Sequence, residues 1–242
     1  MKQFRLGVNF LLSGFKLILK PGVRVYVLIP LLINSLLFTG AILYGANTLN
    51  ELIDTLLVQW QWLEWLTWLL WPIFVIIALA IVFFCFSIIA NLIGAPFNGF
   101  LSAAVERSLT GREVTSENEQ GLTKVILLAF KSELQKILYF IIRAIPLLIL
   151  FILPIVNVAA PFIWFLFTAW MLTIEYGDYP MGNHDIDFKQ QREKLRSNRQ
   201  LAFGFGSGVM VLTMIPVINF LAMPVAVAGA TRMFIESPEL KL

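Results

Sequence analysis

Four long stretches of this chain contain no charged residue at all, and this pattern constrains the fold more than any other feature of the sequence. The stretches cover residues 25–50, 65–105, 144–174 and 201–231. A helix of about 20 apolar residues spans the roughly 30 Å hydrocarbon core of a bilayer. Charged residues make up only 14% of the chain, whereas soluble domains carry about 25%. The pattern argues against a water-soluble enzyme and indicates an all-α integral membrane protein.

The first two stretches predict two long transmembrane helices. Residues 25–44 run apolar for the length of one span, and a second apolar run covers residues 72–93. The loop between them carries acidic residues but no lysine or arginine. Tryptophan favours the headgroup level of a bilayer, and five tryptophans precede the second run: Trp60, Trp62, Trp65, Trp68 and Trp71. Residues 2–20 place their polar side chains three or four apart, which predicts an amphipathic interfacial helix.

The other two stretches are too short for two complete crossings each. Both contain 31 residues, whereas two helical spans need about 40. Two prolines interrupt each stretch near its middle: Pro154 and Pro161 in the first, Pro216 and Pro224 in the second. The arms on either side of the turn are then shorter than one span. We therefore expect two re-entrant, partly penetrating helical hairpins that repeat one another weakly.

The distribution of lysine and arginine supports this topology. The chain has 18 of these residues, and none lies between the two long spans. All of them fall on one side of the membrane if each hairpin returns to the face it entered. The positive-inside rule makes that side, and with it the N-terminus, cytoplasmic. Two full crossings per stretch satisfy the charges equally well, so the hairpins rest on length alone.

These features predict a single membrane domain over residues 1–242. Its expected segments are an interfacial helix at 2–20, a first long helix at 22–57, a second at 60–95, cytoplasmic helices at 96–143, a hairpin at 144–174, a cytoplasmic loop at 175–200 and a second hairpin at 201–235.

The segment from Pro21 to Arg24 is a candidate anion site. Proline is favoured at a helix start, Gly22 lets a ligand approach the backbone, and the first-turn N–H groups of a helix lack intrahelical partners. A helix N-terminus and a guanidinium both favour an anion. The alternative is that Arg24 only flanks a span as a cytoplasmic charge. Basic flanks are common at span ends, and the residues alone favour that alternative.

Further polar residues lie where they would line an aqueous path. Pro96 removes a helix hydrogen bond near the end of the second span, so Asn91 and Asn98 become pore-lining candidates. Asn98 serves equally well as the cap of a following helix. Three charged residues that border the apolar stretches complete the candidates, with simple interfacial charge as the alternative: Glu106, Arg107 and Arg143. If a dianion passes here, Glu106 must be paired, because an unpaired carboxylate would repel it.

Residue patterns for catalysis or cofactor binding are absent from the sequence. The single histidine, His184, lies in a polar segment, and the single cysteine, Cys85, lies in an apolar run. Because metal sites usually need three or four ligands, we expect no metal and no cofactor. The Gly204/Gly208 spacing lacks the lysine of a phosphate-binding loop and favours close helix packing. Since the basic residues flank apolar segments, we also expect no binding to nucleic acid.

Several short motifs taken together resemble the CysZ-type bacterial sulfate transporters. The resemblance covers nearly the whole chain and rests chiefly on Pro21-Gly22-Val23-Arg24, Ala95-Pro96-Phe97-Asn98-Gly99, Leu109-Thr110-Gly111, Trp164-Phe165-Leu166-Phe167, Asp178-Tyr179-Pro180 and Met223-Pro224-Val225-Ala226-Val227. It implies a homo-oligomeric protein of the bacterial inner membrane that brings in sulfate for cysteine synthesis. It also implies sulfate binding at Gly22, Val23 and Arg24. Many relatives have a second arginine next, where this chain has Val25.

We therefore expect a channel-like sulfate importer embedded in the lipid bilayer, assembled as a dimer or a larger homo-oligomer, rather than an enzyme. The alternative is a membrane scaffold or regulatory partner whose segment 175–200 docks a cytoplasmic protein.

Overall fold

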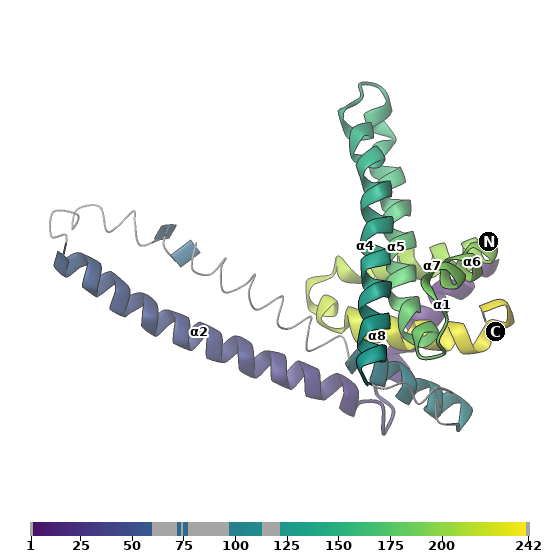
Figure 1. Ribbon diagram of the computed structural model, residues 1–242, viewed down its shortest axis with the longest axis horizontal. Helices are drawn as coiled ribbons and strands as arrows, with labels where there is room; N and C mark the ends of the chain where they lie inside the picture. The colour runs from purple at the N-terminus through teal and green to yellow at the C-terminus, as the bar shows by residue number, and fades with distance from the viewer. Residues whose placement is uncertain (1, 60–71, 74, 77–96, 113–121, 241–242) are drawn as a thin grey trace. The chain divides into compact units, whose positions relative to one another are not determined.

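The computed structural model describes residues 2–59, 72–73, 75–76, 97–112 and 122–240, and every regular element in these ranges is a helix (Figure 1). This confirms the all-α fold class. The α-helices are α1 (Lys2–Leu17), α2 (Val25–Gln59), α4 (Leu122–Ile152), α5 (Ala160–Gly182), α6 (Phe188–Ser197), α7 (Arg199–Thr213) and α8 (Pro216–Glu236). Residues 97–110 are also helical, and 3-10 turns cover Val156–Val158 and Pro238–Leu240.

The chain divides into two compact units, one formed by Met1–Val25 with Asn98–Leu242 and one by Tyr26–Phe97. The described part of the second unit is mainly α2, a 35-residue helix that contains Pro30. Its apolar section Val25–Gly45 is long and apolar enough to cross a membrane. The predicted second long helix at 60–95 lies outside the described residues apart from 72–73 and 75–76, and so do Asn91, Cys85 and the five tryptophans.

α4 and α5 form the first helical hairpin, and the chain reverses between them as the prolines predict. Ile155 adopts a positive φ of 71° directly after Pro154, and the 3-10 turn leads into α5. Aromatic pairs join the two helices: Phe140 stacks on Phe167 with ring centroids 5.5 Å apart, and Phe151 meets Trp164 edge-on. α4 continues through Arg143 into the apolar arm, so the last part of the expected cytoplasmic helices at 96–143 and the first arm of the expected hairpin at 144–174 are one helix. The loss of charge at residue 144 does not end a helix, and neither does every proline: α4 continues through Pro146, and α8 continues through Pro224, which was expected to interrupt the second stretch.

α7 and α8 form the second hairpin, with the turn at Met214 and Ile215 and Pro216 at the first position of α8. Proline suits this position because the first N–H of a helix has no partner in any case. α1 lies beside both helices (Figure 1). A Cβ atom on Gly204 would clash with the Phe4 carbonyl, and one on Gly14 with the Val225 carbonyl. Glycine therefore sets the close packing of α1, α7 and α8, as the Gly204/Gly208 spacing predicts.

The segment 175–200, expected to be a loop, is mostly helical and packed. α5 continues to Gly182, a turn follows, and α6 begins after Asp187, whose carboxylate accepts a 2.8 Å hydrogen bond from the Gln190 backbone N–H. Phe188, Gln191 and Leu195 on α6 are buried. The segment is polar in composition, but one face of α6 is buried against the rest of the unit.

Three described helices have a section that is long and apolar enough to cross a membrane, namely Val25–Gly45 in α2, Lys131–Ile152 in α4 and Pro216–Glu236 in α8. The hairpin helices α4, α5, α7 and α8 have 31, 23, 15 and 21 residues. Most of these helices are longer than the charge-free arms from which the sequence predicts hairpins too short to span the membrane. Re-entrance of the two hairpins stays a prediction.

Candidate functional site

The turn that carries the predicted anion motif has an open backbone. Gly22 has a positive φ of 84°, and no atom lies within 4 Å of the position that a Cβ atom would take there. The Val23 side chain is 1% exposed and fixes the turn to the protein, while Arg24 is exposed. The backbone N–H groups of Val23 and Arg24 both donate to the Lys20 carbonyl at 3.1 Å. These two amides are occupied, and the exposed guanidinium of Arg24 is a donor that the motif offers to a ligand.

The helical segment 97–110 presents one polar face to α5 and α8. Asn98 donates from Nδ2 to the Tyr179 hydroxyl at 3.2 Å, and its Nδ2 lies 3.3 Å from the Met223 sulfur. One turn further on, Ser102 and Thr231 are hydrogen-bonded at 2.9 Å. Asn98 is buried within this contact. The structure therefore uses it to join three helical elements.

Glu106, on the next turn of the same segment, is paired with His184. The His184 Nε2 atom lies 2.9 and 3.0 Å from the two carboxylate oxygens of Glu106, and the imidazole packs against Phe234 with centroids 5.1 Å apart. Nε2 is the donor, because a carboxylate only accepts hydrogen bonds. The partner that Glu106 needs beside an anion is thus present. Arg107, one residue on, is exposed.

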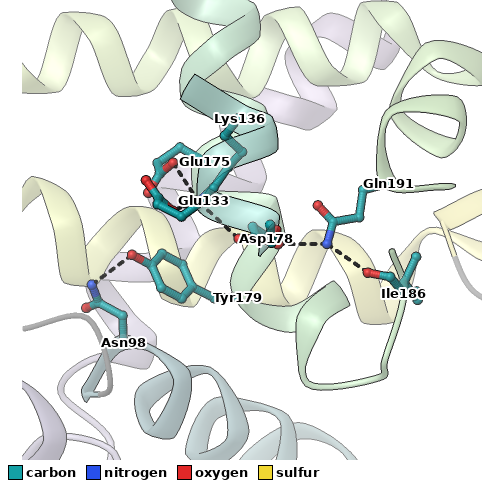
Figure 2. A network of polar contacts seen from close by, with 9 residues as sticks. Asn98, Glu133, Lys136, Glu175, Asp178, Tyr179, Ile186 and Gln191 are labelled. Carbon is teal, nitrogen blue, oxygen red and sulfur yellow. Dashed lines mark hydrogen bonds and ion pairs between the residues drawn. The ribbon is translucent and has the colours of Figure 1, made fainter. Parts of the chain in front are cut away.

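A charged cluster between α4, α5 and α6 lies beside this face and was not predicted from the sequence (Figure 2). Lys136 is buried, with a side chain only 7% exposed, and its ammonium lies 2.7 Å from Glu133, 3.0 Å from Glu175 and 3.0 Å from Asp178. Asp178 also accepts a 2.7 Å hydrogen bond from Gln191, which donates in turn to the Ile186 carbonyl. Three carboxylates thus surround one ammonium.

Burial shifts the pKa of two groups at this cluster. It raises the pKa of Glu175 above its usual value, although the neighbouring Lys136 ammonium opposes the change. It also raises the pKa of Tyr179 to about 12, with the Glu175 carboxylate contributing. The Tyr179 phenol consequently stays protonated at physiological pH.

Arg143 is placed in a different cluster from the other pore-lining candidates. Its guanidinium lies over the ring of Tyr139, 3.8 Å from the centroid, and the Tyr139 hydroxyl accepts a 3.0 Å hydrogen bond from Trp170 Nε1. Arg192 of α6 lies over the same ring. The structure thus brings Asn98 and Glu106 onto one polar face, and it places Arg143 on α4 beside α6.

Long apolar helices, with polar and charged clusters packed between them, define an all-α integral membrane protein. Within the ranges that the structure describes, no group of three or more histidine, cysteine, aspartate or glutamate residues is arranged to hold a metal ion. The chain belongs to the family described as sulfate transporter CysZ/etoposide-induced protein 2.4, whose model matches residues 10–224.

Two relatives support this assignment over almost the full length. One, from Pectobacterium atrosepticum, is 40% identical over 234 residues, which is 96% of this chain and 85% of the relative. The other, from Vibrio parahaemolyticus, is 41% identical over 235 residues, 96% of this chain and 95% of the relative. Both are named sulfate transporter CysZ. Their names point to a transporter rather than an enzyme.

Proposed function

We propose that this protein carries sulfate into the cytoplasm across the bacterial inner membrane, as a channel-like importer that supplies cysteine synthesis. The observation that carries the proposal is the similarity, at 40–41% identity over 96% of the chain, to two proteins named sulfate transporter CysZ. Assembly as a homo-oligomer and a cytoplasmic N-terminus are part of the proposal.

We assign the first sulfate contact to Gly22, Val23 and Arg24. Sulfate gives up a strongly bound water shell, so its site must offer several donors without holding the ion too tightly to release it. Arg24 supplies a planar fork of N–H groups, and the N-terminus of α2 supplies a positive dipole end. Gly22 keeps the approach open, and the buried Val23 fixes the turn. Val25 in place of a second arginine limits the site to one guanidinium.

The polar face of segment 97–110 is the proposed continuation of the path. Asn98, bound to Tyr179, lies at the start of this face, and the pairing of Glu106 with His184 lessens the repulsion that a free carboxylate would exert on a dianion. Asn91 and Arg107 stay candidates for the same lining.

Purified protein in liposomes is expected to admit radiolabelled sulfate faster than protein-free liposomes do. The driving force is an inward sulfate gradient, and no nucleotide is added because the sequence contains no nucleotide-binding motif. Uptake is measured by filtration, with radiolabelled glucose in parallel to report leakage. Sulfate entry equal to that of protein-free vesicles would overturn the proposed function.

Arg24→Gln is expected to weaken sulfate binding by at least about tenfold, because a hydrogen bond to a charged group contributes about 1.5–3 kcal/mol. Affinity is measured by calorimetric titration of the full chain in detergent. The matched control is Arg5→Gln, which removes an exposed arginine from α1 of the same unit. Equal affinity for the Arg24→Gln variant and the unsubstituted chain would show that sulfate binds elsewhere.

A further inference from the structure

Two arginines from different helices share the ring of one tyrosine in a cluster that the proposed sulfate path does not use. The Arg143 guanidinium on α4 lies 3.8 Å from the centroid of Tyr139, and that of Arg192 on α6 lies 4.8 Å from it. Arg192 also lies 4.9 Å from the ring of Phe188. Both cations therefore lie against one ring, although they are 49 positions apart in the sequence.

The aromatic platform under these arginines is firmly held. Trp170 donates from Nε1 to the Tyr139 hydroxyl at 3.0 Å, and Phe188 meets the Tyr139 ring edge-on at 5.8 Å. Trp170 and Phe188 are both buried. Stacking on fixed rings restricts the guanidinium groups to few positions. A ligand that binds both arginines would therefore find them already in place.

Neither arginine of this cluster is neutralised by a carboxylate that the structure describes. Among the described residues, neither Arg143 nor Arg192 forms an ion pair with a carboxylate. The Nε atom of Arg192 is buried, and no described residue accepts a hydrogen bond from it. Two neighbouring guanidinium groups repel one another, and a buried N–H without a partner costs free energy. An anion that accepts hydrogen bonds from both groups relieves both costs.

The position of the cluster identifies the source of that anion. On α4 the residues around Arg143 are apolar and exposed, as with Phe140, Ile142 and Ile145. On α6 the exposed residues are polar, as with Lys189 and Arg196. The cluster therefore lies at the boundary between the apolar surface of α4 and the polar, basic surface of α6. Tyrosine and tryptophan at such a boundary are typical of the headgroup level of a membrane.

We propose that Arg143 and Arg192 bind the phosphate of an anionic phospholipid, with Tyr139 as the platform between them. The phosphate accepts hydrogen bonds from the two guanidinium groups, and the acyl chains lie along the exposed apolar face of α4. A free oxyanion such as sulfate has no acyl chain that could cover this apolar surface. The site does not depend on sulfate uptake, and its occupancy is measured without any flux.

The test is native mass spectrometry of the full chain, titrated in mixed micelles with phosphatidylglycerol and, separately, with neutral phosphatidylcholine. The unsubstituted chain is expected to bind phosphatidylglycerol more tightly. The double variant Arg143→Gln/Arg192→Gln is expected to lose about tenfold or more of that affinity. The matched control is Lys131→Gln/Arg196→Gln, which removes two exposed cations from the same two helices and leaves affinity within about twofold.

Two results would overturn the proposal. Equal losses in the double variant and its control would mean that general positive charge attracts the lipid. Displacement of phosphatidylglycerol by millimolar inorganic sulfate, with sulfate binding that also disappears in the double variant, would mean that the site takes free oxyanions. Thermal unfolding in phosphatidylcholine micelles verifies folding. If the double variant does not fold, the single variants Arg192→Gln and Arg196→Gln are compared instead. A loss of about threefold in affinity for phosphatidylglycerol is then expected only for Arg192→Gln.

Discussion

Gly206→Ala is expected to destabilise the protein by about 3 kcal/mol, although alanine is the better helix former by about 1 kcal/mol. Gly206 lies in α7, where it faces α5, and an added Cβ atom would clash with the Ala169 carbonyl and the Thr173 hydroxyl. The Thr173 hydroxyl lies 2.6 Å from the Ala202 carbonyl, to which it donates, and 3.1 Å from that of Ala169. Backbone cannot move aside as a flexible side chain does, so α5 and α7 must separate. The midpoint of thermal unfolding in detergent measures the loss.

The matched control is Gly177→Ala in α5, another buried helical glycine. Its added Cβ atom would meet only the Leu195 side chain, at 4.0 Å, which is an ordinary van der Waals contact. Helix propensity then dominates, and the variant is expected to match or slightly exceed the stability of the unsubstituted chain. If both variants lose the same stability, close backbone approach is not what fixes glycine at position 206.

The chain reversals could be predicted from the sequence because their causes are local. Pro154 and Pro216 favour a break in the helix, and the structure turns beside both, whereas α8 continues through Pro224. Helix ends that lack such a residue were predicted less well. Nothing at Arg143 interrupts α4, and nothing at Glu175 ends α5, so both helices run past the point where charge begins or ends. Charge patterning indicates where a surface meets water, but it does not determine where a helix stops.

The polar contacts were harder to predict because they join helices far apart in the sequence. The Lys136 pairing with Glu175 connects residues 39 positions apart, and the Glu106 contact with His184 spans 78. One local signal was present: Glu175 and Asp178 are three apart and therefore share a helix face. The candidate role of Arg24 rests on its position at the start of a predicted span, which is local information, and it stays a prediction.

Lys136→Met is expected to destabilise the protein by about 2–3 kcal/mol. Removing one partner of a buried ion pair costs about 3–5 kcal/mol, and the partial exposure of the carboxylates around Lys136 lowers that figure. Methionine keeps the volume and apolar contacts of the lysine stem, so the loss of stability measures the effect of removing the positive charge. Lys131→Met, at an exposed lysine of the same helix, is the matched control and is expected to change stability by less than about 0.5 kcal/mol. The midpoint of thermal unfolding is measured for both variants.

The dependence of this loss on pH separates charge from packing. Without the ammonium, Glu133, Glu175 and Asp178 repel one another, which adds to the burial that already raises the pKa of Glu175. A carboxyl with a raised pKa binds more protons in the folded state than in the unfolded state. Its contribution to stability therefore falls as the pH rises above the unfolded value near 4.5. The Lys136→Met variant should lose more stability between pH 5 and pH 8 than the unsubstituted chain does, and adding Asp178→Asn should recover part of that loss. A pH-independent deficit would show that Lys136 acts through packing alone.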